Sequence, residues 1–269
     1  MNGQDRFVIH QGAKVHYVNY GQGPTALIFI HGWTCNATFW TAQASYFTPR
    51  WRVLAVDLPG HGRSDAPHVA YTQEYLARAV HSVMDHAGVN RAVLIGHSMG
   101  FQVARQLARL FPDQAAALVS VDGSAWRQPT DEDEFMARKR RLASFVATLR
   151  SPQYQQVASS YIDLMFTKMS PPELRHEIKS KMLTTPGHVA ASAMEKMDDP
   201  WVWSDFVVNV PTLAIYSRMP YVDADNREFL RRLFPSLEYH EFSGTGHFLM
   251  MEEPEKFNRV LWDFLEKHQ

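Results

Sequence analysis

The strongest constraint on the fold of this chain is a series of short, almost uninterrupted apolar runs, each followed by a stretch with helical spacing. These runs occupy 26–30, 53–56, 92–95 and 117–121. Runs this short suit strands that are buried on both faces, and helices between such strands connect them in parallel. The stretches 7–9 and 15–18, on either side of Gly12, predict an antiparallel hairpin instead. The first half of the chain therefore predicts a mostly parallel sheet with helices on both faces.

The alternation of strands and helices is interrupted in the middle of the chain. Four segments of helical character, separated by prolines, fill the interval: 131–150, 153–168, 172–183 and 187–197. Strand-like runs return at 212–216 and 237–242, and a helical stretch follows each of them. An all-helical block inside a strand-and-helix sheet is typical of a cap inserted into a core. We predict a core of residues 1–123 and 207–269 and a helical cap of residues 124–206.

A serine between two glycines gives the first indication of chemistry. Gly96-His97-Ser98-Met99-Gly100 matches the pattern G-x-S-x-G, which roughly one chain in ten of this length contains by chance. Here the pattern directly follows the buried run 92–95 and opens a helical stretch, so the two glycines relieve a sharp strand-to-helix turn and leave the serine exposed at its tip. The alternative is an ordinary glycine-rich turn with a helix-capping serine.

The order of the motifs along the chain resembles that of the α/β-hydrolase superfamily over essentially the whole length. The motifs are His31-Gly32-Trp33, Asp57-Leu58-Pro59-Gly60-His61-Gly62-Arg63-Ser64, the serine motif, and Gly244-Thr245-Gly246-His247-Phe248. The resemblance implies an α/β-hydrolase fold: a mostly parallel eight-stranded sheet flanked by helices, with an inserted helical cap. It also implies hydrolysis of carboxylic esters or related acyl compounds without a metal or an organic cofactor. It does not identify the substrate, because this fold supports many chemistries.

A serine nucleophile needs a base, and the base needs an acid that orients it. His247 stands in the position that the resemblance assigns to the base, in a glycine-containing loop between the last strand and the last helix. Many family members place the acid after the strand at 212–216, but no carboxylate occurs a few residues beyond it, and Asp223 comes late. A known alternative places the acid directly before the cap, where Asp122 stands. We predict Asp122 as the acid and keep Asp223 as the alternative.

The same resemblance predicts the oxyanion hole and part of the substrate pocket. In this fold one backbone N–H comes from the residue after the nucleophile, Met99, and another from the loop after the third strand, which we assign to Trp33. The predicted cap is rich in methionine and aromatic residues. Most of these should form its own small core, while a few should line an apolar pocket over the serine. Within the cap the pocket candidate is Trp126, just past Asp122, and from the core we add Phe101 and Phe248.

Composition and charge exclude several classes of partner. The formal net charge is −1 and the pI is about 6.9, so nothing favours nucleic acid or an anionic membrane. Cys35 is the only cysteine, which excludes an internal disulfide. The N-terminus lacks a signal pattern, and the run 26–30 is too short to span a bilayer. We expect a cytoplasmic protein that acts on a small molecule with an apolar acyl or aromatic part; the oligomeric state does not follow from the sequence.

Several functions use these parts, and the sequence leaves them open. The leading prediction is ester hydrolysis through an acyl-enzyme, with lactone, thioester or C–C bond hydrolysis by the same residues as the nearest alternatives. The acid at Asp122 and the His-Gly-Trp loop also resemble the cofactor-free dioxygenases of this fold, although the glycine pattern around Ser98 is typical of hydrolases. A third class is a non-catalytic ligand receptor. The basic run 138–141 is expected to be a solvated helix face, with Glu134 paired to Arg138.

Overall fold

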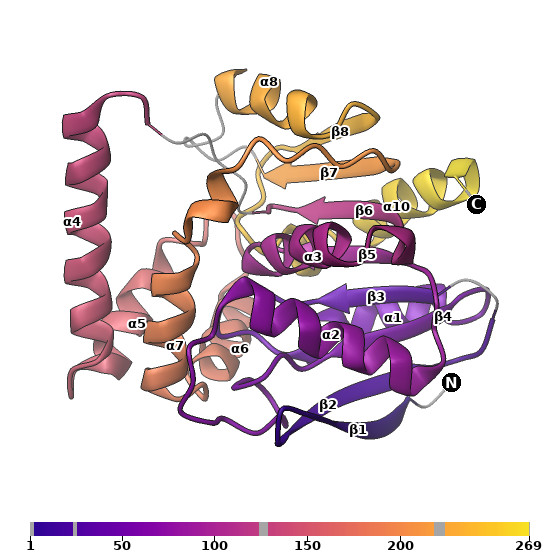
Figure 1. Cartoon of the computed structure of the whole chain (residues 1–269), viewed down its shortest axis with the longest axis horizontal. Helices are drawn as coiled ribbons and strands as arrows, with labels where there is room; N and C mark the ends of the chain where they lie inside the picture. Colours follow the sequence, from indigo (N-terminus) through magenta and orange to yellow (C-terminus); the bar gives the residue numbers. More distant parts are fainter. Residues whose placement is uncertain (1–2, 24–25, 124–128, 218–223, 269) are drawn as a thin grey trace.

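The structure is a computed structural model that describes residues 3–23, 26–123, 129–217 and 224–268. It contains one eight-stranded sheet of order β1-β2-β4-β3-β5-β6-β7-β8 (Figure 1). The strands are β1 (Gln4–His10), β2 (Ala13–Tyr20), β3 (Ala26–Ile30), β4 (Arg52–Val56), β5 (Ala92–His97), β6 (Ala115–Val121), β7 (Thr212–Ser217) and β8 (Leu237–Phe242). β1 and β2 form the predicted antiparallel hairpin, β2 is antiparallel to β4, and all other pairs are parallel.

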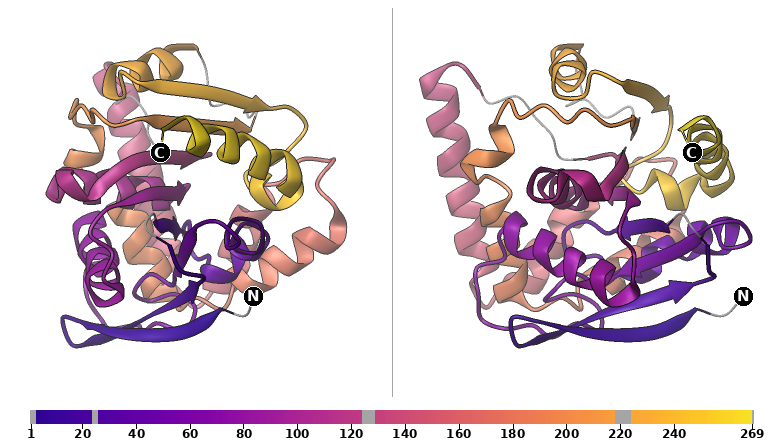
Figure 2. Two further views of the ribbon diagram at one scale, coloured as in Figure 1. Left: turned by 90° about the vertical axis from the view of Figure 1, so that its right-hand side faces the viewer. Right: turned by 45° about the vertical axis from the view of Figure 1, so that its right-hand side comes forward.

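The centre of the sheet is buried on both faces, as the apolar runs predict. Every residue of β3 and of β5 is buried. The helices of this part are α1 (Thr41–Phe47), α2 (Gln73–Ala87), α3 (Met99–Leu110), α8 (Ala224–Leu233), α9 (Leu249–Glu252) and α10 (Pro254–His268). Figure 2 shows α2 and α3 on one face of the sheet, with α1 and α10 on the other. The short helices α1 and α9 were not predicted, since neither is long enough to show a clear period.

Between β6 and β7 the described residues 129–206 form only helices and loops, and we call them the helical insert. Its helices are α4 (Glu132–Leu149), α5 (Tyr154–Asp163), α6 (Pro172–Met182) and α7 (Gly187–Lys196). Asp131 caps α4 by accepting a hydrogen bond from the Glu134 N–H at 2.8 Å. α5 is shorter than the predicted 153–168, and the residues after Asp163 form a turn and a loop. The division into a core and a cap at residues 124 and 207 remains our proposal.

The helical insert lies at the end of the sheet to which the parallel strands point (Figure 1). In open sheets of this kind, ligands bind beyond the carboxyl ends of the strands. The architecture therefore places a helical layer over the edge where Ser98, Asp122 and His247 are found. None of the described helices is long and apolar enough to cross a bilayer.

Candidate active site

Ser98 occupies a strained turn between β5 and α3. Its backbone has φ 52° and ψ −120°, which an L-residue rarely adopts, and its N–H donates to the Val121 carbonyl at 3.0 Å. A Cβ on Gly96 would lie 2.4 Å from the Gly100 carbonyl oxygen, and a Cβ on Gly100 would lie 2.3 Å from the Ile30 carbonyl oxygen. Both glycines are therefore required by close backbone packing, which holds the serine at the tip of the turn.

Asp122 and His247 meet at the same edge of the sheet. Asp122 directly follows β6, with φ 45°, and its Oδ2 lies 2.5 Å from His247 Nδ1. Its other oxygen, Oδ1, accepts hydrogen bonds from the N–H and the hydroxyl of Ser217, each at 2.9 Å. The carboxylate is 3% exposed, so its charge is balanced by these donors rather than by water. The arrangement fixes the imidazole with Nδ1 toward Asp122 and leaves Nε2 for another partner.

Ser217 was missed by the sequence analysis. It ends β7, where we searched for a carboxylate, and it instead supplies two donors to a carboxylate on the neighbouring strand. A hydroxyl residue at the carboxyl end of a strand beside the predicted acid was the available signal. The alternative acid, Asp223, and the pocket candidate Trp126 lie outside the described residues.

Two further contacts hold His247. Its N–H donates to the Met165 carbonyl in the helical insert at 2.8 Å, and its carbonyl accepts from His97 Nε2 at 2.9 Å. Burial lowers the pKa of His97 well below its ordinary value, and the proximity of His247 lowers it further. His97 is therefore neutral, and its Nε2–H serves as a donor to the backbone of His247.

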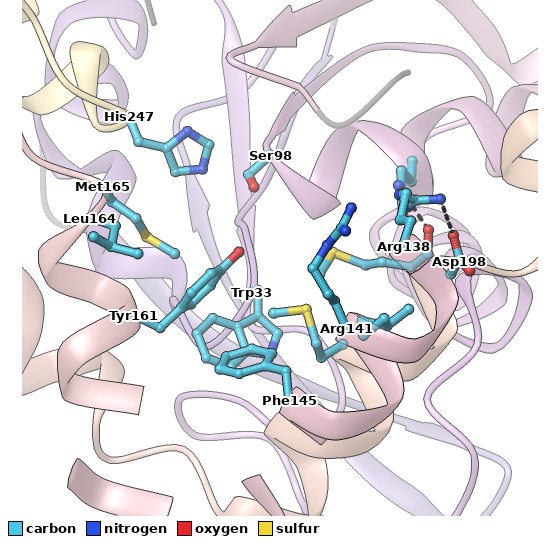
Figure 3. A pocket seen from close by; sticks show the side chains of 14 residues that line it. Trp33, Ser98, Arg138, Arg141, Phe145, Tyr161, Leu164, Met165, Asp198 and His247 are labelled. Atoms are coloured by element: carbon cyan, nitrogen blue, oxygen red, sulfur yellow. Dashed lines mark hydrogen bonds and ion pairs between the residues drawn. The ribbon is translucent and has the colours of Figure 1, made fainter. Parts of the chain in front are cut away.

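Ser98 and His247 both face one cavity, and Figure 3 shows their side chains at the same end of it. No hydrogen bond joins the two side chains among the described residues. Such bonds are often long in an empty site and shorten when substrate binds. The serine hydroxyl and the imidazole therefore lie on the same wall of the cavity.

The predicted oxyanion hole involves two backbone N–H groups near Ser98. Met99 is the first residue of α3, so its N–H has no acceptor within the helix. The loop that carries Trp33 packs closely on the turn, since a Cβ on Gly32 would lie 3.1 Å from the Ser98 Cβ. No acceptor for the Met99 or the Trp33 N–H occurs in the described part of the chain. The two segments that pack around the serine thus each carry an N–H without an acceptor among the described residues, and we predict that these N–H groups form the oxyanion hole.

The cavity encloses about 540 Å³ and is lined by residues of both parts of the molecule (Figure 3). The sheet side contributes Trp33, Ser98, Gln102 and His247. The Trp33 indole also donates to the Ala190 carbonyl at 2.8 Å, which ties it to α7. The apolar lining comes from the helical insert: Leu142, Phe145, Tyr161, Leu164, Met165, Met194 and Met197. The predicted contribution of insert aromatics and methionines to the pocket agrees with this lining.

The structure does not bring Phe101 or Phe248 to the cavity. Both are fully buried. Phe101 packs on Phe234 with ring centroids 5.6 Å apart, and Phe248 packs beneath the site against Phe39 and His97. Each is adjacent in sequence to a site residue or one helical turn away, but its side chain points into the core. The Phe248 ring contacts the His247 ring edge-on, with centroids 5.5 Å apart, and does not line the cavity.

The basic run on α4 differs from its prediction. Arg138 and Arg141 line the cavity instead of belonging to a wholly solvated face. Arg138 Nη1 lies 2.7 Å from Asp198 Oδ1, so the expected pair with Glu134 is replaced by one with a residue beyond α7. The reason is tertiary: α4 packs against α7, and this packing brings Asp198 to a face that local spacing had assigned to solvent.

Other chemistry has little support among the described residues. No group of three or more His, Cys, Asp or Glu side chains there could hold a metal ion. Cys35 is buried, and burial raises the pKa of its thiol far above the ordinary value, so it stays protonated. Of the predicted triad, Ser98 and His247 line the cavity.

Comparison with known proteins agrees with the fold. The chain is 27% identical to a 2-hydroxy-6-oxononadienedioate/2-hydroxy-6-oxononatrienedioate hydrolase of Paraburkholderia phymatum, over 94% of this chain and 91% of the relative. It is 28% identical to the pimeloyl-[acyl-carrier protein] methyl ester esterase of Vibrio cholerae, over 91% and 95%. A thermophilic esterase from Thermogutta terrifontis superposes with a TM-score of 0.83 at 25% identity, over 99% and 100%. A family model described as alpha/beta hydrolase fold matches residues 25–254, and the chain therefore belongs to the alpha/beta hydrolase fold family.

Proposed function

We propose that the protein is a serine hydrolase that cleaves carboxylic esters of small molecules through an acyl-enzyme. The observation that carries the proposal is the hydrogen bond between Asp122 Oδ2 and His247 Nδ1, beside a serine held in a positive-φ turn at the same cavity. The positive φ at Ser98 costs conformational energy, and strained residues of this kind are concentrated at functional sites. A serine beside an Asp-oriented histidine is suited to nucleophilic catalysis.

In the proposed reaction, Ser98 Oγ attacks the carbonyl carbon while His247 Nε2 takes the hydroxyl proton. The Met99 and Trp33 N–H groups stabilise the negative charge that develops on the carbonyl oxygen. When the tetrahedral intermediate collapses, the C–O bond to the alcohol breaks and His247 returns the proton to the departing oxygen. Water then attacks the acyl-enzyme while His247 Nε2 takes one of its protons, the bond between the acyl carbon and Ser98 Oγ breaks, and His247 returns the proton to Ser98 as the carboxylic acid leaves. Asp122 stabilises the imidazolium in both halves.

The lining of the cavity supports a substrate with an apolar acyl or aromatic part. Phe145, Tyr161 and the methionines provide apolar surface, and methionine side chains adapt to irregular ligands. A cavity of about 540 Å³ is within the range of small-molecule sites. We therefore propose a small molecule, rather than a macromolecule threaded through the site, as the substrate.

A second candidate is hydrolysis of a C–C bond by the same residues. The relative from Paraburkholderia phymatum is named as a hydrolase of hydroxy-oxo-dienedioates, and such a reaction also begins at a carbonyl. It differs from ester cleavage in the leaving group, which is a carbon atom that must receive a proton. Because the same residues around Ser98 would serve either reaction, the structure does not separate ester cleavage from C–C cleavage. Only an activity assay distinguishes the two reactions.

The test is the rate of hydrolysis of p-nitrophenyl esters from acetate to decanoate, with Ser98→Ala measured in parallel. We expect turnover that falls by at least about 10⁴-fold in the variant while the fold is retained. Wild-type turnover that survives Ser98→Ala contradicts the serine mechanism. A folded protein with no esterase activity contradicts ester cleavage, and the next assays are C–C cleavage of a vinylogous diketone and oxygen uptake with a hydroxyquinolone.

A further inference from the structure

The charges around the cavity are unevenly paired. Asp198 is buried, and its two oxygens lie 2.7 Å from Arg138 Nη1 and 3.6 Å from Lys139 Nζ. The Arg138 guanidinium also lies over the Trp203 ring, 4.1 Å from its centroid. Two cations therefore share one carboxylate, and Arg138 is held against a ring as well. Both oxygens of Asp198 are therefore already paired with a cation.

Arg141 is the cation that remains. Within the part of the chain that the structure describes, no carboxylate, hydrogen-bond acceptor or aromatic ring is paired with its guanidinium. Figure 3 shows the side chain extending from α4 into the cavity, whereas Arg138 is turned toward Asp198. The surrounding wall is largely apolar and includes Phe145, Met194 and Met197. The N–H donors of an unpaired guanidinium beside such a wall are available to a hydrogen-bond acceptor on a ligand in the cavity.

The spacing along α4 explains why Arg141 lines the cavity and its neighbour Arg140 does not. Arg138, Arg141 and Phe145 are three and four residues apart, so they lie on one face of the helix, and all three line the cavity. Arg140 lies on a different face and does not line the cavity, although both Arg140 and Arg141 are exposed to solvent. The two arginines are adjacent in sequence but differ in what they can contact.

We propose that the cavity binds substrates that carry a carboxylate, and that Arg141 holds this group while the reacting carbonyl lies at Ser98. A guanidinium matches a carboxylate with two parallel hydrogen bonds, and no other free cation lines the described cavity. The inference rests on the proposed function and names its substrate class: esters whose acyl chain ends in a carboxylate.

The experiment compares two pairs of esters, and within each pair one member carries the terminal carboxylate and the other has it capped. Mono-p-nitrophenyl adipate and suberate carry a free carboxylate, and the same compounds capped as methyl esters do not. The enzymes are wild type, Arg141→Gln, Arg141→Lys and the matched control Arg140→Gln. We expect Arg141→Gln to lower kcat/KM for a free-acid ester by about tenfold to a hundredfold, mainly through KM, and to change the capped ester less than about threefold.

The variants separate a charge effect from a structural one. Arg141→Lys should retain part of the preference for the free acid, and Arg140→Gln should leave it unchanged. The preference should also weaken as ionic strength rises, since part of Arg141 is exposed to solvent. Equal losses on the free and capped esters in Arg141→Gln, or a wild type that prefers the capped esters at both chain lengths, would overturn the inference.

A binding measurement keeps this inference separable from the proposed function. The p-nitroanilide of adipic acid keeps the carboxylate and contains an amide, and its methyl-capped form is the neutral control. Calorimetric titration of Ser98→Ala should give tighter binding of the free acid, and adding Arg141→Gln should abolish the difference. If wild type cleaves no ester but this binding difference appears, the ester assignment fails and the anion site stands; if esters are cleaved without the difference, the reverse holds.

Discussion

The sheet-based core and the helical insert are built with different degrees of constraint. In the core, α3 buries ten of its twelve residues, and β5 buries every residue. In the helical insert, α4 buries two of eighteen, Val146 and Leu149. The groups that we propose for bond breaking stand on the core, whereas most of the cavity lining comes from the insert. The side chains that we propose for bond breaking are therefore held by densely packed neighbours, whereas most residues that contact the ligand lie on helices with little buried surface.

The two parts are nevertheless joined at defined points. The Trp33 indole donates to the Ala190 carbonyl in α7, and the His247 N–H donates to the Met165 carbonyl in the loop after α5. Arg105 of α3 donates to the carbonyls of Val202, Ser204 and Phe206, at 2.7 to 3.1 Å. α7 and the segment after it are thus fastened to the core, and α4 packs on α7. Changes on α4 should therefore alter ligand binding with little effect on the reactive groups.

The largest effect should come from the acid of the core. Asp122→Asn removes the charge that orients and stabilises the His247 imidazole, so kcat should fall by about 10³- to 10⁴-fold with the fold intact. Steady-state kinetics on the best p-nitrophenyl ester, with circular dichroism as the folding check, measures this. Asp223→Asn is the control, and it should retain nearly full activity. If Asp223→Asn loses activity and Asp122→Asn does not, the acid is assigned to the wrong residue.

The same substitution in the two parts should differ in its cost. Gly100→Ala puts a Cβ 2.3 Å from the Ile30 carbonyl oxygen, and backbone must move to relieve the clash. Gly187→Ala, in the first turn of α7, puts a Cβ 3.1 Å from Tyr154 Cγ, which a small side-chain shift relieves. We expect Gly100→Ala to lower the free energy of unfolding by about 1–3 kcal/mol and Gly187→Ala by less than about 1 kcal/mol. Urea denaturation measures both, and similar losses would contradict the difference in constraint.

A smaller effect on the core should depend on pH. His16 is buried, and burial by itself lowers its pKa, but its hydrogen bonds to Asp57 at 2.7 Å and Asp5 at 2.9 Å raise the pKa above the ordinary value. Burial tends to raise the pKa of Asp57, but the hydrogen bonds from His16, Ala37 and Arg63 outweigh it, so that pKa is lowered. The His16 contribution is fully present below its unfolded pKa of 6.5 and is lost as pH rises through the raised folded value. The Asp57 contribution is present above its unfolded pKa of 3.8 and is lost as pH falls.

The pair should therefore stabilise the core most between these two unfolded pKa values. His16→Gln should cost on the order of 1 kcal/mol more at about pH 5.5 than at about pH 8.5. Urea denaturation at both pH values measures the difference between wild type and variant. The exposed His240 provides the matched control, since His240→Gln should show no such pH-dependent difference. A His16→Gln penalty that grows with pH would contradict the assigned direction.

The agreement between sequence and structure is best where a local pattern has only one way to be built. Ser98, with Gly96 and Gly100, is such a case, because the turn requires a residue without Cβ at both glycine positions. The position of Asp122 is similar, since it directly follows a buried strand beside the one that leads to Ser98. Parallel neighbouring strands end at the same edge, so their following residues meet without further information.

Local patterns in the sequence were therefore enough to predict the sheet and the serine turn, and the family resemblance added His247 and Asp122, with Asp223 left open. Only the tertiary structure decided that Phe101 and Phe248 turn into the core, that Ser217 binds Asp122, and that Arg138 and Arg141 face the cavity. The two cases differ in how much a local pattern says about orientation. A strand that is buried on both faces can be placed without knowing which side is polar, whereas α4 carries charged residues over much of its circumference. Which of its faces meets the cavity is set by packing against α7 and not by its own pattern.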